Sequence, residues 1–296
     1  MTKDERRGSK DHGRPTTDEN VLLVVLSRII NTMVFDLKIL PTDLLNAYTT
    51  QVGEGLNERI AGLSESELSS ETFSFYTSVS AVFSSKIEGE NVELDSFVKH
   101  KKFGTEYLPD YTRKTDDLYN AYQFAKENKI SRKNIEQAHA LLTENILPAN
   151  KRGKISSGKM YVTAPTGKIE YVAASPFALE ADLEKFYADI IILQQSVLNI
   201  QEIFFFASII HLLFVKIHPF DDGNGRISRL LEKWFLAEKL GPHAWFIQSE
   251  KHYYVHHALY YTNLRRLGLE YEALDYLKAL PFLLMLPASL DSDFRE

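Results

Sequence analysis

The chain has 296 residues, of which 44% are hydrophobic and 25% are charged, and its formal net charge at pH 7 is -6. This length allows one large domain or two modest ones with ample core. The mild acidity gives no electrostatic reason to expect nucleic acid or an anionic membrane surface as a partner. Because cysteine is absent, disulfides and thiolate zinc sites are excluded. We expect a soluble, cytoplasmic globular protein.

The N-terminal part divides into a polar segment at residues 1–20 and an apolar segment at residues 21–40. Residues 1–20 carry charges of both signs and lack the apolar stretch of a secretory signal, so we expect a disordered lead. Residues 21–40 are apolar over most of their length, which predicts a buried helix. Pro41 interrupts this pattern, and Thr42 or Asp43 can cap the helix that follows.

Helical patterns dominate most of the remaining chain, and one segment differs. We expect helices at residues 71–87, 115–127 and 131–146, with Ser64 and Ser70 as cap candidates before the first. After residue 176 the expected helices are 177–195, 200–217, 226–240, 253–268 and 269–286.

A β-hairpin is predicted between these two groups of helices. The β-type segments 160–164 and 169–173 are separated by Pro165, Thr166 and Gly167, which form a turn signal. The chain therefore reads as helical with one hairpin.

The most apolar run, residues 203–217, ends at a strongly polar turn. It is interrupted by Ser208, His211 and Lys216 and is shorter than the about 20 apolar residues that a membrane span needs. We therefore expect a core helix and no membrane span.

The turn that follows reads HPFDDGNGRISR over residues 218–229. A glycine-rich turn before a helix exposes backbone N–H groups, which attract phosphate together with the helix dipole. Gly223 and Gly225 have no Cβ to keep a phosphate away from the backbone. Arg226 and Arg229 are three residues apart and share one helix face, so both can reach the same polyphosphate.

Two further groups of this turn suit chemistry on a nucleotide. Asp222 is placed to hold Mg²⁺ against phosphate oxygens, and His218 has an ordinary pKa that suits a general base near neutral pH. Phe220 can anchor the turn in the core. These residues predict a nucleoside triphosphate site with a metal ligand and a base, with a plain inter-helix turn as the alternative. They do not indicate which phosphorus atom is attacked.

The same twelve residues resemble the signature of the Fic family, H-P-F-x-[D/E]-G-N-[G/K]-R-x-x-R, at every specified position. The resemblance implies an all-α fold, the Fic helical bundle with one β-hairpin flap. It places the Fic domain at residues 100–265, after an N-terminal helical region at 21–99 and before a C-terminal extension at 266–296. It also implies a protein adenylyltransferase that moves AMP from ATP, with Mg²⁺, to a Ser, Thr or Tyr hydroxyl of a target protein.

The resemblance gives each motif residue a role. His218 would deprotonate the target hydroxyl, and Asp222 would bind Mg²⁺. The ATP phosphates would be held by an anion hole and two arginines, with the β-phosphate at the first arginine and the γ-phosphate at the second: Gly223, Asn224, Gly225, Arg226 and Arg229. Glycine at position 225 favours nucleotidyl transfer, because a relative that transfers a terminal phosphate has lysine there.

A second motif lies upstream, where residues 84–89 read SSKIEG. Ser84 and Glu88 are four residues apart on one helix face, and Gly89 suits a helix end. Alone, this pair would be read as solvated. It resembles the inhibitory motif [S/T]-x-x-x-E-[G/N] of Fic proteins with an N-terminal inhibitory helix, which implies that Glu88 pairs with Arg229 and blocks productive ATP binding.

Other residues gain expected roles from the same resemblance. The hairpin would be the flap that docks a target segment, with Lys159, Val162 and Tyr171 as its contact residues, although an ordinary surface hairpin is the alternative. Tyr254 and Tyr261 would line the adenine pocket, although both can equally be core residues.

Histidines outside the motif are expected to have structural roles. His139 and His211 lie on apolar helical faces and are expected to be packed or hydrogen-bonded. His252 and His256 have metal-compatible spacing but lack a third ligand, so we expect no metal there.

Four readings compete with transfer of AMP to a protein. The same scaffold could transfer another nucleotide group, remove AMP, act as a nucleotide kinase or hydrolase, or bind ATP as a non-catalytic regulator. The resemblance also allows a homodimer. The identity of the target protein is not encoded in any pattern that we identify.

Overall fold

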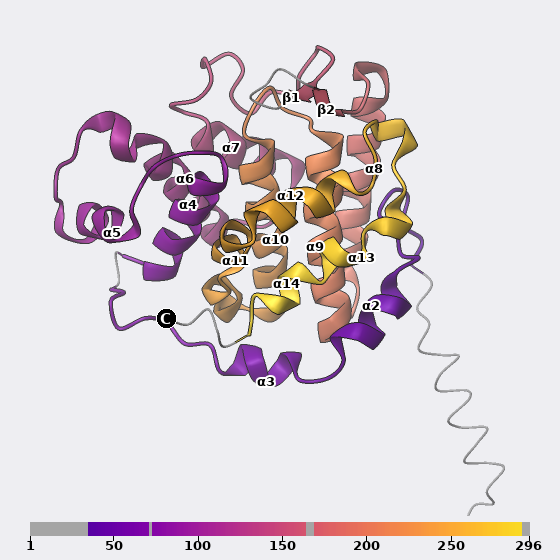
Figure 1. Ribbon diagram of the computed structural model, residues 1–296, viewed down its shortest axis with the longest axis horizontal. Helices are drawn as coiled ribbons and strands as arrows, with labels where there is room; N and C mark the ends of the chain where they lie inside the picture. The colour runs from indigo at the N-terminus through magenta and orange to yellow at the C-terminus, as the bar shows by residue number, and fades with distance from the viewer. Residues whose placement is uncertain (1–34, 71–72, 164–168, 292–296) are drawn as a thin grey trace, which may run out of the picture. The chain divides into compact units, whose positions relative to one another are not determined.

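The computed structural model describes residues 35–70, 73–163 and 169–291. The segment Leu37–Glu296 forms one compact unit, which holds all the elements below. This unit is mainly helical, with one small sheet of two strands among the described residues (Figure 1). The all-α bundle with one hairpin is therefore confirmed. The predicted lead, most of the predicted helix at 21–40 and the predicted hairpin turn lie outside the described residues.

The predicted helix at 21–40 does not extend to its expected end. Residues 37–40 are not helical, because their backbone is held by a side chain from another helix. The N–H groups of Lys38, Ile39 and Leu40 donate to the buried carboxylate of Asp189, over 2.6, 2.8 and 2.9 Å.

Six helices precede the hairpin in the described chain. Ser74 caps the inhibitory-motif helix by accepting the N–H of Thr77, so this helix starts later than predicted and neither Ser64 nor Ser70 caps it. Ser131 caps its predicted helix as expected. The bounds are α2 (Leu45–Val52), α3 (Leu56–Ala61), α4 (Phe75–Ile87), α5 (Leu94–Phe103), α6 (Pro109–Glu127) and α7 (Arg132–Leu142).

The hairpin leads into three long helices. Strands β1 (Tyr161–Thr163) and β2 (Ile169–Val172) pair antiparallel, and helices α8 (Pro176–Gln195), α9 (Ile200–Ile217) and α10 (Asn224–Leu240) follow. Helices α9 and α10 run side by side through the centre of the bundle (Figure 1). Within the described part of the chain, α9 alone is long and apolar enough to cross a membrane, and 78% of it is buried inside the protein, as expected of a core helix.

The predicted C-terminal helices are wrong in two places. The expected helix at 253–268 is broken at His256 into α11 (Ser249–Val255) and α12 (His257–Arg265). The expected helix at 269–286 is replaced by short pieces, because Asp275 caps a new turn and Pro281 cannot continue a helix. These pieces are η2 (Tyr271–Ala273), η3 (Tyr276–Lys278), α13 (Leu280–Leu283) and α14 (Met285–Ala288); η1 (Pro242–Phe246) follows α10.

A wholly buried ion pair fixes α4 in the centre of the molecule. Lys233 of α10 and Glu250 of α11 pair with both side chains fully buried. Ser80 of α4 contacts both charged groups, and Tyr122 of α6 donates to the Glu250 carboxylate over 2.6 Å. Four helices therefore share one polar network, and α4 belongs to the core.

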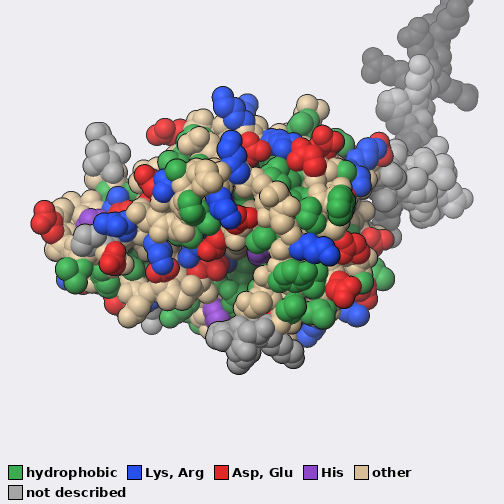
Figure 2. All heavy atoms as spheres, turned by 90° about the horizontal axis from the view of Figure 1, so that it is seen from above, with side chains coloured by type: hydrophobic (Ala, Val, Ile, Leu, Met, Phe, Trp, Pro, Cys, Tyr) green, Lys and Arg blue, Asp and Glu red, His purple; other side chains and the backbone are tan. Residues whose placement is uncertain are grey.

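The surface carries charges of both signs. Figure 2 shows Lys and Arg side chains interspersed with Asp and Glu on the face seen there, without a large patch of one sign.

Candidate active site

His218 ends α9 in an unusual backbone conformation. Its φ of 55° and ψ of 56° lie in the left-handed region, and no other non-glycine residue in the described chain has positive φ. Its Nδ1 lies 3.2 Å from the carbonyl oxygen of Val215. Because a carbonyl only accepts, Nδ1 carries the proton and Nε2 keeps its lone pair.

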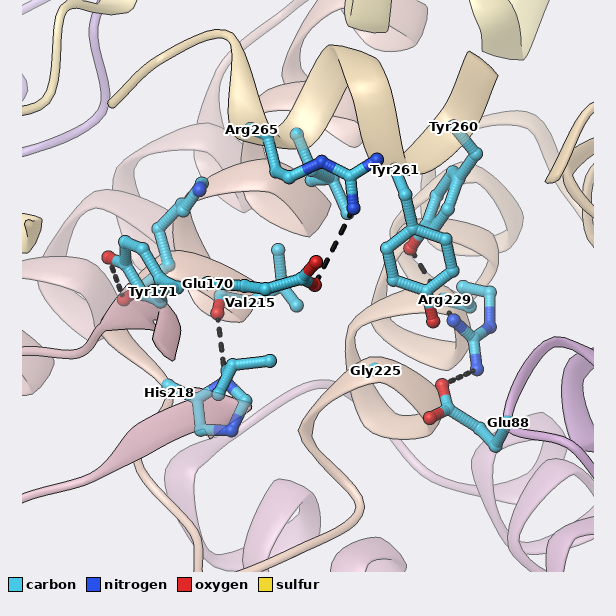
Figure 3. A pocket seen from close by; sticks show the side chains of 13 residues that line it. Glu88, Glu170, Tyr171, Val215, His218, Gly225, Arg229, Tyr260, Tyr261 and Arg265 are labelled. Carbon is cyan, nitrogen blue, oxygen red and sulfur yellow. Dashed lines mark hydrogen bonds and ion pairs between the residues drawn. The ribbon is translucent and has the colours of Figure 1, made fainter. Parts of the chain in front are cut away.

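His218 is held in the neutral form that a general base requires. Burial lowers the pKa of its imidazole, although the bond to Val215 and the charge of Glu88 oppose this effect. The side chain lines a pocket, and Figure 3 shows it on the opposite side from Glu88 and Arg229, with Gly225 between them. A base and a cationic group therefore face one cavity.

The turn after His218 is fastened from inside. The side chain of Asn224 bonds both backbone groups of Phe220, over 2.9 and 2.7 Å. The Phe220 ring stacks on His139 at 3.7 Å, as the predicted anchor of the turn. Nδ1 of His139 accepts the N–H of Gly153, so Nε2 donates to the carbonyl of Asp222, 2.8 Å away.

His139 is both packed and hydrogen-bonded, as expected, and its bonds hold the turn that follows His218. Burial lowers its pKa to about 4, so the ring is neutral near pH 7 and its two nitrogens keep their donor and acceptor roles. No spacing in the sequence links it to a turn more than 80 residues away.

The two glycines of the turn meet different constraints. Gly223 has a φ of 81°, and a Cβ there would lie 2.9 Å from Thr143. A Cβ on Gly225 would collide with the Glu88 carboxylate and lie 3.2 Å from Arg229. Glu88 thus lies against the first turn of α10, where the helix leaves backbone N–H groups without intrahelical partners.

Every nitrogen of the Arg229 guanidinium has a hydrogen-bond partner. Nε donates to Oγ of Ser84 over 2.8 Å, and Nη2 donates to the Ser84 carbonyl over 3.1 Å and to Glu88 Oε1 over 2.6 Å. Nη1 donates to the hydroxyl of Tyr260 over 3.4 Å. The arginine side chain is 1% exposed and Glu88 is 26% exposed.

The electrostatics of this ion pair keep both partners charged. Burial would raise the pKa of Glu88, but the charges of Arg229 and Arg226 outweigh it, and the pKa is lowered. For Arg229, burial lowers the pKa, but Glu88, Tyr260 and Tyr261 together outweigh this effect, and the pKa is raised. Gly89 follows with a φ of 90° and ends the helix, as expected.

Arg226 is buried like Arg229 but is held loosely. Its nearest carboxylates are Glu90, 3.7 Å from Nη2, and Asp222, 3.9 Å from Nη1, and its Nε has no hydrogen-bond partner among the described residues. Glu90 also pairs with Lys114 over 2.8 Å. The sequence patterns did not identify Glu90, although it lies only two residues after Glu88.

Asp222 has the chemistry that a magnesium site needs. Its carboxylate is 54% exposed, and its Oδ1 accepts the N–H of Gly223 over 2.5 Å. The described residues hold no group of three or more His, Asp or Glu that could bind a metal by themselves. Mg²⁺ commonly takes one or two carboxylates and completes its shell with substrate phosphates and water, so Asp222 beside the arginines fits it.

The walls of the pocket come from the hairpin and from α12. Glu170 of β2 and Arg265 of α12 form an ion pair over 3.5 Å and point toward each other in Figure 3. The complete lining is Glu88, Val162, Glu170, Tyr171, Val215, Lys216, His218, Gly225, Arg229, Tyr260, Tyr261, Leu264 and Arg265.

The structure separates the three predicted flap residues. Val162 lines the pocket, whereas Lys159 is exposed and does not. Tyr171 also lines the pocket but is 6% exposed, and its hydroxyl donates to the carbonyl of Lys216 over 2.7 Å. The Lys216 ammonium lies 4.1 Å from its ring. Tyr171 therefore fastens the hairpin to α9 and does not project toward a docking partner.

The two predicted adenine-pocket tyrosines also differ in position. Tyr261 lines the pocket, and burial raises its pKa to about 12. Tyr254 is outside the lining and packs against Phe83 of α4, with 5.5 Å between ring centroids. The helix break at His256 explains the difference. Tyr260, which the patterns missed, lines the pocket beside Arg229.

Comparisons with solved structures show a fold similar to that of Fic proteins. A Fic family protein from Desulfovibrio desulfuricans G20 has a TM-score of 0.67 at 19% identity, over 86% of this chain and 74% of that chain. A Fic domain containing signaling protein from Bacteroides thetaiotaomicron VPI-5482 has a TM-score of 0.56 at 18% identity, over 83% and 91%. Fic-1 from C. elegans has a TM-score of 0.60 at 16% identity, over 94% and 76%.

At the level of sequence, the comparison with curated proteins found no match. Residues 129–236 match the model of the Fic/DOC family. This segment holds the whole turn from His218 to Arg229 and leaves out the helix that carries Glu88. Fic domains transfer nucleotide groups onto proteins. Residues 129–236 therefore resemble a Fic/DOC domain, within a chain whose fold is similar to the folds of Fic proteins.

Proposed function

We propose that this protein is a protein adenylyltransferase that moves AMP from ATP to a Ser, Thr or Tyr hydroxyl of a target protein, and that Glu88 inhibits it. The observation that carries this proposal is the Glu88 carboxylate itself. It bonds Arg229 over 2.6 Å and lies against Gly225 at the start of α10. An anionic group already occupies part of a site whose shape and charge suit a phosphate.

The geometry supports a chemical step with His218 as the base. Nε2 would accept the proton of the target hydroxyl, whose oxygen would attack the α-phosphorus of ATP. The bond from this phosphorus to the bridging oxygen would break, and pyrophosphate would leave. Mg²⁺ bound at Asp222 would neutralise phosphate charge. Arg226 and Arg229 would hold the β- and γ-phosphates and stabilise the leaving group.

Inhibition would act through competition for Arg229. The γ-phosphate and the Glu88 carboxylate require the same N–H groups, so ATP cannot bind in full while the ion pair is intact. Breaking a buried ion pair costs several kcal/mol. Replacement of Glu88 by glycine should remove this cost, and we expect AMP transfer to rise at least about tenfold.

The test uses labelled ATP and the purified full-length protein, first for self-modification and then with a lysate that supplies targets. Glu88→Gly should increase labelling. Glu93→Gln is the matched control, because Glu93 pairs with Lys86 over 3.1 Å on the same segment and touches neither arginine. Equal labelling of wild type and Glu88→Gly would contradict the inhibition.

A second variant tests the base in the same assay. His218→Ala in the Glu88→Gly background should reduce transfer by about 10²- to 10⁴-fold. Persistent labelling would show that His218 is not the base. Mass spectrometry of the adduct separates AMP from another nucleotide group. ATP binding without transfer in Glu88→Gly would indicate a non-catalytic regulator, and release of inorganic phosphate or ADP would indicate a kinase or hydrolase.

A further inference from the structure

A chain of hydrogen bonds runs from Arg229 away from the pocket and into the core. Nη1 of Arg229 lies 3.4 Å from the Tyr260 hydroxyl, which lies 3.0 Å from Nε2 of His211. Nδ1 of His211 lies 2.8 Å from Oε2 of Glu232, and Tyr253 donates to the same oxygen over 2.8 Å. All five side chains are at most 1% exposed. The chain is therefore sealed from water.

The direction of every bond in this chain follows from Arg229. A guanidinium only donates, so the Tyr260 oxygen accepts from it. The single hydroxyl proton of Tyr260 then goes to Nε2 of His211. A neutral imidazole has one proton, which must lie on Nδ1 and point to Glu232. The arrangement thus uses each donor and acceptor of Tyr260 and His211 once.

The chain fixes one edge of the guanidinium independently of the inhibitory motif. Tyr260 is on α12, His211 is on α9, and Glu232 shares α10 with Arg229. None of them belongs to α4, which supplies Ser84 and Glu88. If Glu88 withdraws, Nη1 remains bound to Tyr260 while Nη2 loses its carboxylate partner. Nη2 is then the group that can meet an anion in the pocket.

We propose that Tyr260, His211 and Glu232 are positioning residues that orient Arg229 toward the terminal phosphate of a nucleoside triphosphate. This inference rests on the role of Arg229 in the proposed function. Its chemistry is specific, because in the proposed function Arg229 holds the γ-phosphate, which ADP lacks. A carboxylate that fixes a histidine, which in turn fixes a hydroxyl, strengthens each bond along the chain. The oriented tyrosine then acts as an acceptor that holds Arg229 in one rotamer.

The alternative is a network that only stabilises the core. A stabilising network would affect ATP and ADP alike, whereas a positioning network would affect the ligand that has a γ-phosphate. The ratio of ATP affinity to ADP affinity therefore separates the two roles. It does not require that AMP transfer occurs.

The experiment measures Mg²⁺-ATP and Mg²⁺-ADP binding by calorimetry in the Glu88→Gly protein. Tyr260→Phe keeps the ring and removes the hydroxyl. We expect it to weaken ATP binding by about three- to tenfold and to leave ADP binding unchanged. Glu232→Gln should act in the same direction to a smaller extent, and it provides a second test should Tyr260→Phe fold poorly.

Tyr122→Phe is the matched control. It also removes one buried tyrosine hydroxyl beside a buried carboxylate, that of Glu250, but in the network that does not reach Arg229. We expect it to leave the ATP-to-ADP affinity ratio unchanged. Thermal unfolding of each variant checks that the fold is intact.

The outcomes also separate this inference from the proposed function. Equal weakening of ATP and ADP by Tyr260→Phe, or no change in either, would overturn the positioning role. Failure of Glu88→Gly to bind ATP would overturn both proposals. A Glu88→Gly protein that binds ATP but transfers no AMP would contradict only the proposed function, and the affinity ratio would still decide the role of Tyr260.

Discussion

The two halves of the phosphate site at the start of α10 are organised differently. The Arg229 half is filled, since the guanidinium bonds Ser84, Glu88 and Tyr260. The Arg226 half is equally buried but open, since its closest carboxylates lie 3.7 and 3.9 Å away. The two arginines are three positions apart on one helix. If Glu88 inhibits as proposed, this difference means that the segment carrying it would compete for the far end of a triphosphate and leave the nearer cation available.

The largest expected effect of this difference is on stability. Arg229→Ala should lower the free energy of unfolding by about 3–5 kcal/mol, because it removes a hydrogen-bonded buried ion pair. Arg226→Ala should lower it by about 1 kcal/mol or less, because no hydrogen bond within 3.5 Å is lost. Urea unfolding of the two variants measures both values. Similar losses of unfolding free energy in Arg229→Ala and Arg226→Ala would contradict the difference between the two arginines.

A smaller effect is expected on the affinity for ATP. In the Glu88→Gly background, Glu90→Gln removes a negative charge 3.7 Å from Arg226, where the β-phosphate would bind. We expect the KM for ATP to fall by about two- to fivefold, which corresponds to roughly 0.5–1 kcal/mol. Glu93→Gln in the same background is the control and should leave KM unchanged. A rise in KM would show that Glu90 helps, and does not oppose, ligand binding.

The smallest effect is on the pH profile. Because burial lowers the pKa of His218 below 6.5, the base stays neutral near pH 7, and transfer is lost only as pH falls through the lowered value. Glu88 raises that pKa, so the acid limb of Glu88→Gly should lie below pH 6.5, which rates between ~pH 5 and ~9 would show. A half-maximal rate above pH 6.5 would contradict the assignment.

The wild-type ion pair should not respond over the same pH range. The folded pKa of Glu88 is lowered from 4.5, so its stabilising charge is fully present above that value and is lost only as pH falls through the lower one. The factor by which AMP transfer by Glu88→Gly exceeds that of the wild type should therefore not fall as the pH is lowered from ~9 to ~5. A factor that falls near pH 6 would show that another titrating group controls the pair.

The sequence predicted the parts of the site that lie close together along the chain. His218 to Arg229 form one contiguous turn, and Ser84 to Gly89 form one helix end, so spacing placed the residues of each motif together. The pairing of Glu88 with Arg229 came from the family resemblance. Tyr260, His139 and Glu90 reach the site through tertiary packing, and no local pattern marks them. The break at His256 changes the helical phase. The family resemblance assigned Tyr254 to the pocket together with Tyr261, whereas the structure places Tyr260 there beside Tyr261.

The fold was predicted in the same uneven way. Strongly periodic helices with clear caps, such as α8 and α9, appear where the patterns placed them, whereas α7 ends at Leu142, before the predicted residue 146. The prediction of one helix after Gly268 was wrong, because Asp275 and Pro281 start new short helical pieces despite the helix-forming composition of the segment. The predicted end of the helix at 21–40 was wrong, because three N–H groups there donate to Asp189, which lies about 150 positions away in the sequence.

The burial of Ser80 against Lys233 and Glu250 has a consequence for how such an enzyme can be switched on. Glu88, the residue proposed to inhibit the site, ends the same helix, α4, that completes the core. A shortened protein that begins after Gly89 would leave two charged side chains without the helix that covers them, and we expect it to unfold instead of working without restraint. If Glu88 inhibits as proposed, release would be a small event, in which one carboxylate swings away from Arg229 while the rest of α4 stays in place.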